Sequence, residues 1–157
     1  MNLHSAKAGE LLAFLACERG GMVSKQRTAE TLWPNAEGDR ARRSLYKIIQ
    51  HIRKLTFGGQ AIPLLDAHGE ISLDLRRVRV DAEEFLNLYA SASPEDWERA
   101  LELYRGILLL DSDYDWAHEY ETFYDVRYYE LLERLARYYS DAKNENLARY
   151  YRNRLSE

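Results

Sequence analysis

The sequence predicts a mainly α-helical protein of two domains, in which three helices and a β-hairpin precede a second, wholly helical domain. Apolar residues recur at helical spacing through most of the chain, and two extended stretches separated by a turn lie near its middle. The charge also changes sign: residues 1–79 carry a net charge of +5 and residues 80–157 a net charge of −9, within a total of −4. This asymmetry indicates two functions in one chain and predicts a domain boundary between residues 79 and 80.

Two helices are expected at the start of the chain. From Ala8 to Ala16 the apolar residues follow the i, i+3, i+4, i+7 spacing of an amphipathic helix, which Gly20-Gly21 should end. Met22-Val23 is compatible with one short strand. Ser24 is then suited to cap a second helix, which Pro34 stops.

A third helix and a hairpin complete the predicted first domain. Asp39 is suited to cap a helix from about Arg40 to Thr56, which Gly58-Gly59 should close. The extended stretches 62–65 and 70–75 follow, the second with alternating polar and apolar residues. Three helices followed by such a hairpin predict a winged helix-turn-helix.

The second half is expected to consist of consecutive helices. Asp81 can cap the first of them, and Ser93-Pro94 opens another that Gly106 should break. A long helix is expected after Trp116, and a final one over residues 147–155. Helices joined by short loops indicate antiparallel pairs of the tetratricopeptide-repeat (TPR) type, although no 34-residue repeat is visible.

The third helix carries the prediction of DNA binding. Its apolar residues gather on one side, and no acidic residue occurs from Arg40 to Phe57. Several cations without a nearby carboxylate repel one another, and an external anion would relieve this repulsion. The polar side holds a central stripe of Arg43, Lys47, Gln50 and Lys54, with Arg40, Arg42, Tyr46, His51 and Arg53 as its flanks. Arginine can read guanine, Gln50 can read adenine, and lysine suits phosphate. The alternative is a solvated helix face.

The residues after and within the hairpin are weaker candidates. Arg76 and Arg77 could contact backbone phosphates or an adjacent minor groove, or they could lie in a solvated strand end or pair with the acidic half. His68 lies at the expected hairpin tip, where an ordinary turn residue is the simpler interpretation.

Several classes of protein are not supported by the sequence. No segment has the length and hydrophobicity of a membrane span or signal peptide, so a cytoplasmic location and no membrane partner are expected. The single cysteine, Cys17, lies in an apolar stretch, and the four histidines lack metal-ligand spacing. No nucleophile elbow, phosphate loop or dinucleotide fingerprint occurs. We therefore expect no enzymatic activity, no metal and no cofactor.

Two parts of the sequence resemble known bacterial domains. The run AKAGELLAFLACERGGMVSKQRTAETLWPNAEGDRARRSLYKIIQHIRKL resembles the OmpR-like winged helix of bacterial activators. The segments DAEEFLNLY, ALELYRGILL and DWAHEYE resemble the bacterial transcriptional activator domain that is fused to it in the antibiotic-regulator (SARP) group and in related two-component regulators. The resemblance spans about residues 5–140.

The resemblance implies specific roles. It places Arg43, Ser44, Lys47, Gln50, His51, Arg53 and Lys54 on the recognition helix, the hairpin near His68 as the wing, and residues 34–39 at a contact with RNA polymerase. The expected partners are double-stranded promoter DNA and RNA polymerase or another transcription protein. The second domain would serve dimerisation, contact with the transcription machinery or signal transmission.

The sequence departs from this pattern at its start. OmpR-like domains begin with a small antiparallel sheet, whereas only a few residues precede Ala8 here. Either the chain is a fragment of a larger regulator, which can also include a receiver domain, or the fold has dispensed with this sheet. We expect a fragment, because the missing strands would leave one face of the first helix uncovered. The alternative function is a protein-interaction module whose winged helix does not bind DNA, for which the negative overall charge and the absent sheet are the motivation.

Overall fold

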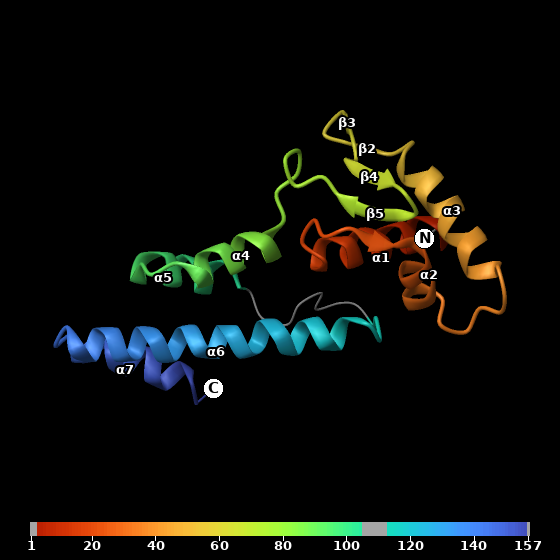
Figure 1. The fold of residues 1–157 in the computed structure, drawn as a ribbon. Helices are drawn as coiled ribbons and strands as arrows, with labels where there is room; N and C mark the ends of the chain where they lie inside the picture. The colour runs from red at the N-terminus through yellow and green to blue at the C-terminus, as the bar shows by residue number, and fades with distance from the viewer. Residues whose placement is uncertain (1–2, 105–112, 157) are drawn as a thin grey trace. The chain divides into compact units, whose positions relative to one another are not determined.

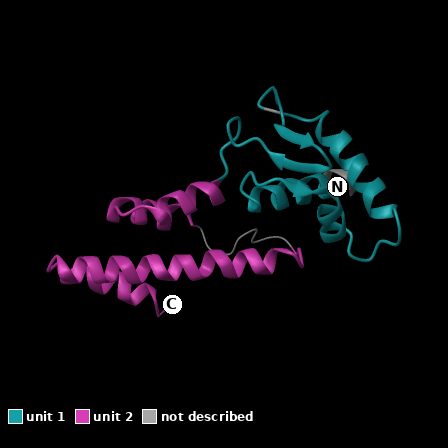
Figure 2. Cartoon of the chain, in the orientation of Figure 1, with its two compact units in different colours: residues 1–80 teal, residues 81–157 magenta. Residues whose placement is uncertain are grey.

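The structure is a computed structural model that describes residues 3–104 and 113–156. Its described part is mainly helical, with seven helices and a small three-stranded antiparallel sheet (Figure 1). The chain divides into two compact units, residues 1–80 and 81–157, which we call unit 1 and unit 2 (Figure 2). The predicted helix break at Gly106 lies outside the described residues.

Unit 1 begins with two helices on either side of a short strand. Helix α1 spans Leu3–Cys17, β1 spans Val23–Ser24 and α2 spans Lys25–Leu32. The first helix thus begins five residues before its predicted start. The Ser24 side chain accepts a hydrogen bond from the Arg27 amide at 3.1 Å, which confirms the predicted cap of α2.

Helix α3 spans Arg40–Ile52 and has one buried face. The predicted inner face is confirmed for five residues, which are buried: Ala41, Leu45, Ile48, Ile49 and Ile52. The predicted cap is wrong, because the Asp39 side chain makes no capping hydrogen bond. Its backbone has ψ near 4° instead of the extended conformation that aims a capping carboxylate at the helix start.

Helix α3 ends four residues before the predicted Thr56, because the chain tightens into a turn. The amides of Lys54 and Leu55 donate to carbonyls three residues earlier. Strand β2 (Thr56–Phe57) then pairs with β3 (Gln60–Ala61). The glycines between them, Gly58 and Gly59, both have positive φ, as a two-residue hairpin turn requires. Gly58-Gly59 therefore forms this unpredicted hairpin instead of closing the helix.

The predicted hairpin is present, but its first strand is shifted along the chain. Strand β4 spans Leu64–Ala67 and β5 spans Glu70–Leu73, in a sheet of order β1-β5-β4. Pro63 has no amide hydrogen to donate to a neighbouring strand. The first strand therefore begins at Leu64, directly after Pro63, and not at residue 62 as predicted. Apolar residues of α1, β1, α2, α3 and β5 form the core of this unit, with Leu11, Phe14, Leu15, Val23, Leu32 and Ile71 among its buried side chains.

Unit 2 contains helices that pack consecutively. Its described helices are α4 (Asp81–Ala90), α5 (Pro94–Leu103), α6 (Ala117–Asp141) and α7 (Glu145–Arg154). Helix α4 contacts α5, α5 contacts α6, and α7 folds back along α6 (Figure 1). The buried core comprises Phe85, Ala100, Leu101, Tyr124, Leu131, Leu132, Leu135, Ala148 and Tyr151.

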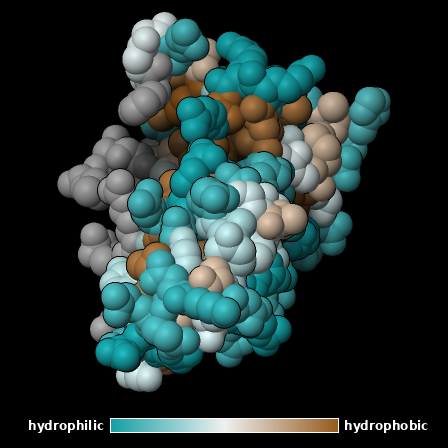
Figure 3. Space-filling view, turned by 90° about the vertical axis from the view of Figure 1, so that its left-hand side faces the viewer, coloured by the Kyte–Doolittle hydropathy of each residue, from teal (hydrophilic) through white to brown (hydrophobic). Residues whose placement is uncertain are grey.

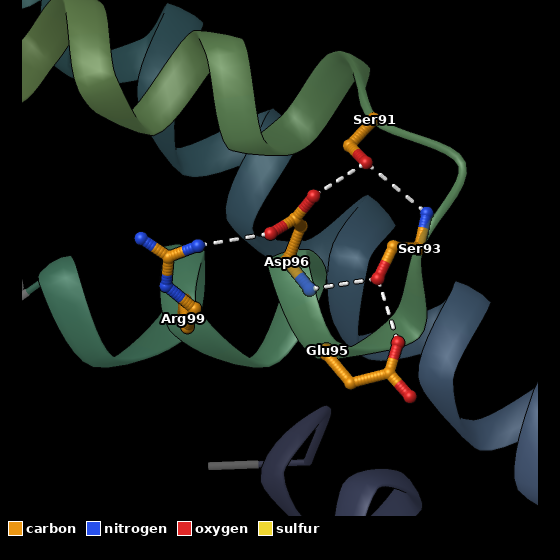
Figure 4. Close-up of polar contacts among 5 residues, drawn as sticks. All are labelled: Ser91, Ser93, Glu95, Asp96 and Arg99. Carbon is orange, nitrogen blue, oxygen red and sulfur yellow. Dashed lines mark hydrogen bonds and ion pairs between the residues drawn. The ribbon is translucent and has the colours of Figure 1, made fainter.

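The start of α5 is stabilised by a network of polar side chains (Figure 4). The Ser93 hydroxyl accepts from the Asp96 amide at 3.4 Å, and Pro94 occupies the first turn, as the sequence predicts. Asp96 also accepts from the Ser91 hydroxyl at 2.7 Å and from Arg99 at 3.0 Å. The Ser93 hydroxyl donates to Glu95 at 2.6 Å, and this bond lowers the pKa of the Glu95 carboxyl.

Tyrosines and carboxylates connect the helices of unit 2. Glu98 on α5 accepts hydrogen bonds at 2.8 Å from the hydroxyls of Tyr139 on α6 and Tyr151 on α7. The Tyr89 hydroxyl of α4 donates to Glu130, and it accepts from Arg134 at 2.9 Å. The pKa of Tyr139 is raised to about 12, chiefly by its bond to Glu98. Burial, and then the same carboxylate, raise the pKa of Tyr151.

The surface is mixed in character. In Figure 3, hydrophilic side chains predominate on the face in view, and hydrophobic ones gather in its upper part. Val126, Tyr129, Tyr138 and Tyr150 are the large hydrophobic residues of unit 2 that are exposed among those described. Within the described ranges, no helix combines the length and the hydrophobicity that crossing a membrane requires.

Candidate nucleic-acid interface

The outer face of α3 carries several exposed cations. Four exposed cations lie on it or directly after the helix, namely Arg40, Arg43, Lys47 and Lys54. Within the part of the chain that the structure describes, none of these four side chains forms an ion pair. The folded protein therefore leaves their charges to solvent or to an external anion.

Gln50 of the central stripe and several neighbouring predicted residues differ from these four cations in exposure or pairing. Gln50, Ser44 and His51 are half-buried, so a part of each side chain reaches the surface. Arg42 is exposed and only 3.9 Å from the equally exposed Asp39, a pair that contributes little. The structure thus leaves most of the predicted residues of α3 exposed, and Ser44, Gln50 and His51 are the half-buried ones among them.

Tyr46 is the exposed aromatic residue of α3. Its relative exposure is 63%, which is high for a large ring. The ring lines a hollow of about 550 Å³ at the start of α2 and the adjoining side of α3. The other lining residues are Lys25, Asp39, Arg42, Arg43, Leu45, Lys47 and Ile49. An apolar floor with a cationic rim suits a planar or methyl-bearing group that is attached to phosphate.

Arg53 differs from Arg43, Lys47 and Lys54 because a carboxylate binds it. Its Nη2 donates to Asp66 Oδ2 at 2.6 Å, and the other oxygen of Asp66 accepts from Lys25 Nζ. Asp66 lies on β4, Lys25 begins α2 and Arg53 follows α3. One carboxylate therefore joins three elements of unit 1 and neutralises part of two cations.

His68 forms the turn of the β4–β5 hairpin, together with Gly69. Both residues have positive φ, 51° and 82°, and His68 is exposed. This is the two-residue turn whose twist matches that of the flanking strands. The interpretation of His68 as a turn residue is therefore confirmed. The carbonyl of Gly69 accepts a hydrogen bond from the Lys25 amide at 2.9 Å, so the tip of the hairpin is attached to the start of α2.

Arg76 is bound within its own unit. Its Nε and Nη2 donate to the two carboxylate oxygens of Asp74 at 2.8 and 3.0 Å. These bonds lower the pKa of the Asp74 carboxyl and raise that of the Arg76 guanidinium. An ion pair of Arg76 with the acidic half of the chain was one of the expectations from the sequence. Its partner is instead Asp74, two residues away. Arg77 is exposed, and its amide donates to the Asp74 carbonyl at 2.9 Å.

The sequence reasoning missed two residues of this surface, Lys25 and Asp66. Lys25 directly follows Ser24, the cap of α2. A cation at the start of this helix could have been recognised from the sequence as part of the cationic surface. Asp66 was visible as an acidic residue directly after the predicted stretch 62–65 of a basic domain. Its pairing with residues 13 and 41 positions away was not, because periodicity carries no information on contacts at that separation.

Other kinds of site find no support in the described residues. Among them, no three His, Cys, Asp or Glu side chains are grouped so as to hold a metal ion. Cys17 is buried, in agreement with its predicted role as a small apolar residue. Comparisons of the chain with protein-family models, with curated proteins and with solved structures find no match.

Proposed function

We propose that unit 1 is a winged helix-turn-helix that binds double-stranded promoter DNA, and that the protein is a transcription regulator. In this proposal α3 enters the major groove and the β4–β5 hairpin is the wing. The observation that carries it is the outer face of α3, where four exposed cations have no ion-pair partner among the described residues.

The character of the face favours DNA over a generic acidic surface. The buried side of α3 is fully used by the core, so the opposite side is free to enter a groove. Arginine and glutamine can form paired hydrogen bonds with guanine and adenine, which a solvated face does not require. Arg43 and Gln50 are the proposed base-reading residues, while Lys47 and Lys54 are proposed to contact phosphates.

Unit 2 is proposed to be a TPR-like helical domain that contacts RNA polymerase, another transcription protein or a second copy of the chain. Its helices pack consecutively, and Val126 and Tyr129 of α6 expose apolar surface that its own core does not use. Exposed aromatic side chains of this kind are common in protein interfaces.

The test is selection from a random duplex library at low salt, followed by sequencing of the retained DNA. We expect an enriched motif for the unchanged chain and its loss in the variant that combines Arg43→Ala, Lys47→Ala and Gln50→Ala. Retention without enrichment would refute sequence-specific reading. No retention at all would support the alternative, a protein-interaction module without DNA binding.

A further inference from the structure

One carboxylate of unit 1 lies where a DNA-binding surface would ordinarily present only cations. Asp66 has a side-chain exposure of 16%, compared with 33% for Lys25 and 44% for Arg53. Each of its two oxygens accepts from one of these cations. Because the carboxylate is mostly shielded from water, its attraction to both cations is screened less than that of an exposed pair.

The two cations that Asp66 holds border the proposed DNA-contacting face. Lys25 lines the same hollow as Arg43 and Lys47. Arg53 follows the last turn of α3, next to Lys54. A phosphate that approaches either cation must compete with a carboxylate that is already in place, whereas a phosphate that approaches Arg43 or Lys47 meets no such competitor.

The position of Asp66 is fixed by the backbone around it. It pairs with Ile71 across the β4–β5 hairpin, and the tip of that hairpin is attached to the start of α2 through the bond from the Lys25 amide to Gly69. The carboxylate can therefore follow a cation that turns toward DNA only as far as its two side-chain torsions allow. Lys25 and Arg53 have longer side chains with more rotatable bonds, so they can reach further than Asp66.

We propose that Asp66 withholds Lys25 and Arg53 from DNA phosphates and thereby limits the sequence-independent affinity of unit 1 for duplex DNA. This inference rests on the proposed function. The consequence is a division of the cations: those of the central stripe of α3 contact DNA, and the two at its borders serve the fold. Such a limit is useful because non-specific sites greatly outnumber specific ones and compete for the protein.

The test compares the full chain with Asp66→Asn in binding to a random-sequence duplex at several salt concentrations. Each additional phosphate contact steepens the slope of log affinity against log salt by about 0.9. Release of one or both cations should therefore steepen the slope by about 0.9 to 1.8 and tighten binding at 0.1 M salt by roughly 8- to 60-fold. Glu70→Gln is the matched control, because it removes an exposed carboxylate from the same hairpin without releasing a cation pair.

An equal effect of the two variants would overturn the inference, since the change would then follow from net charge alone. Weaker binding by Asp66→Asn would also overturn it, because the carboxylate would then be presenting the cations to DNA. If wild type binds no duplex at all, the proposed function fails together with the inference. If the wild-type chain binds duplex DNA, and Asp66→Asn and Glu70→Gln change the affinity and the salt slope equally, only the inference fails.

A second variant keeps the inference testable if Asp66→Asn does not fold. Arg53→Gln removes a cation that the proposal excludes from phosphate contact, so the salt slope should remain within about 0.3 of the wild-type value, well below the 0.9 of one contact. A slope that becomes shallower by about 0.9 would show that Arg53 contacts a phosphate, and would overturn the inference. Thermal unfolding shows whether the variant is folded under the binding conditions, and the slopes are compared for folded protein.

Discussion

The two units use their charged side chains in opposite ways. On the outer face of α3 in unit 1, exposed cations have no ion-pair partner among the described residues. In unit 2, Glu98 and Glu130 accept hydrogen bonds from tyrosines on neighbouring helices, and Arg134 donates to Tyr89. Charges that connect helices are part of the fold. Unpaired cations that lie together on one helix face are available to an anionic partner, and this grouping on α3 locates the candidate site.

The comparison also applies within unit 1. Asp66 and Asp74 hold Lys25, Arg53 and Arg76, so a positive residue in the basic half is not by itself evidence of DNA contact. Ion pairing divides the predicted contact residues into those that a carboxylate of unit 1 binds and those that have no ion-pair partner among the described residues.

The largest effect is expected from the unpaired cations of α3. Replacing Arg43, Lys47 and Lys54 together with alanine should weaken duplex binding at 0.1 M salt by roughly 100- to 1000-fold, because each lost contact costs about tenfold. Fluorescence anisotropy with a labelled duplex measures this change. The control carries Arg137→Ala, Lys143→Ala and Arg149→Ala, three exposed cations of the acidic unit, and should change affinity less than about threefold. If both triple variants lost the same duplex affinity, the cations of α3 would contribute no more to DNA binding than those of unit 2.

The next effect concerns the carboxylate that connects three helices of unit 2. Glu98→Gln weakens two hydrogen bonds from tyrosine to a charged acceptor, and should lower the free energy of unfolding by about 1.5 to 3 kcal/mol. Urea unfolding followed by circular dichroism measures the loss. Glu102→Gln, an exposed position on the same helix, is the control and should be nearly neutral. If the two variants were equally stable, Glu98 would have no structural role.

The same cluster predicts a dependence of stability on alkaline pH. Tyrosines of the unfolded chain ionise near pH 10, whereas Glu98 raises the pKa of Tyr139 to about 12 and burial also raises that of Tyr151. The folded state binds these protons more tightly, so the stabilisation is complete below about pH 10 and is lost as the pH rises towards about 12. Urea unfolding over this range should show the loss, and Glu98→Gln should reduce it. If the stability of Glu98→Gln depended on pH as that of the wild type does, the Glu98 carboxylate would not be the cause of the raised pKa of Tyr139.

The smallest effect is expected at the start of α5. Ser93→Ala removes the cap that accepts from the Asp96 amide and the hydroxyl that donates to Glu95, and should cost about 1 kcal/mol of stability. Thermal unfolding measures this change, and duplex binding should be unaffected because the hydroxyl serves the fold alone. Ser93→Thr keeps a capping oxygen and should recover most of the loss. A variant as stable as wild type would contradict the role of the cap.

The sequence predicted those parts of the fold that depend on local pattern. The buried face of α3 follows from its apolar spacing, and the caps Ser24 and Ser93 follow from residue type next to a helix start. The errors have local causes too. Gly58-Gly59 forms a hairpin turn instead of a helix stop, and Pro63 delays β4. Glycine and proline mark a change of structure without saying which structure follows.

The candidate site was predictable only in part. The cationic stripe was visible because no acidic residue occurs from Arg40 to Phe57. The pairing of Arg53 and Lys25 with Asp66 was not visible, since it depends on how the hairpin lies against α2 and α3. Pairing across 13 or 41 residues requires a structure, and it changes which cations are available to DNA.

The most direct test of this account is an NMR titration of the uniformly labelled chain with duplex DNA at low salt. We expect the largest chemical-shift changes on α3, at the start of α2 and in the β4–β5 hairpin, with the guanidinium signal of Arg43 shifting more than that of Arg53. The signals of unit 2 around Glu98 should remain unchanged. Changes centred on unit 2, or none on α3, would contradict the claim that unpaired cations mark the DNA-binding surface.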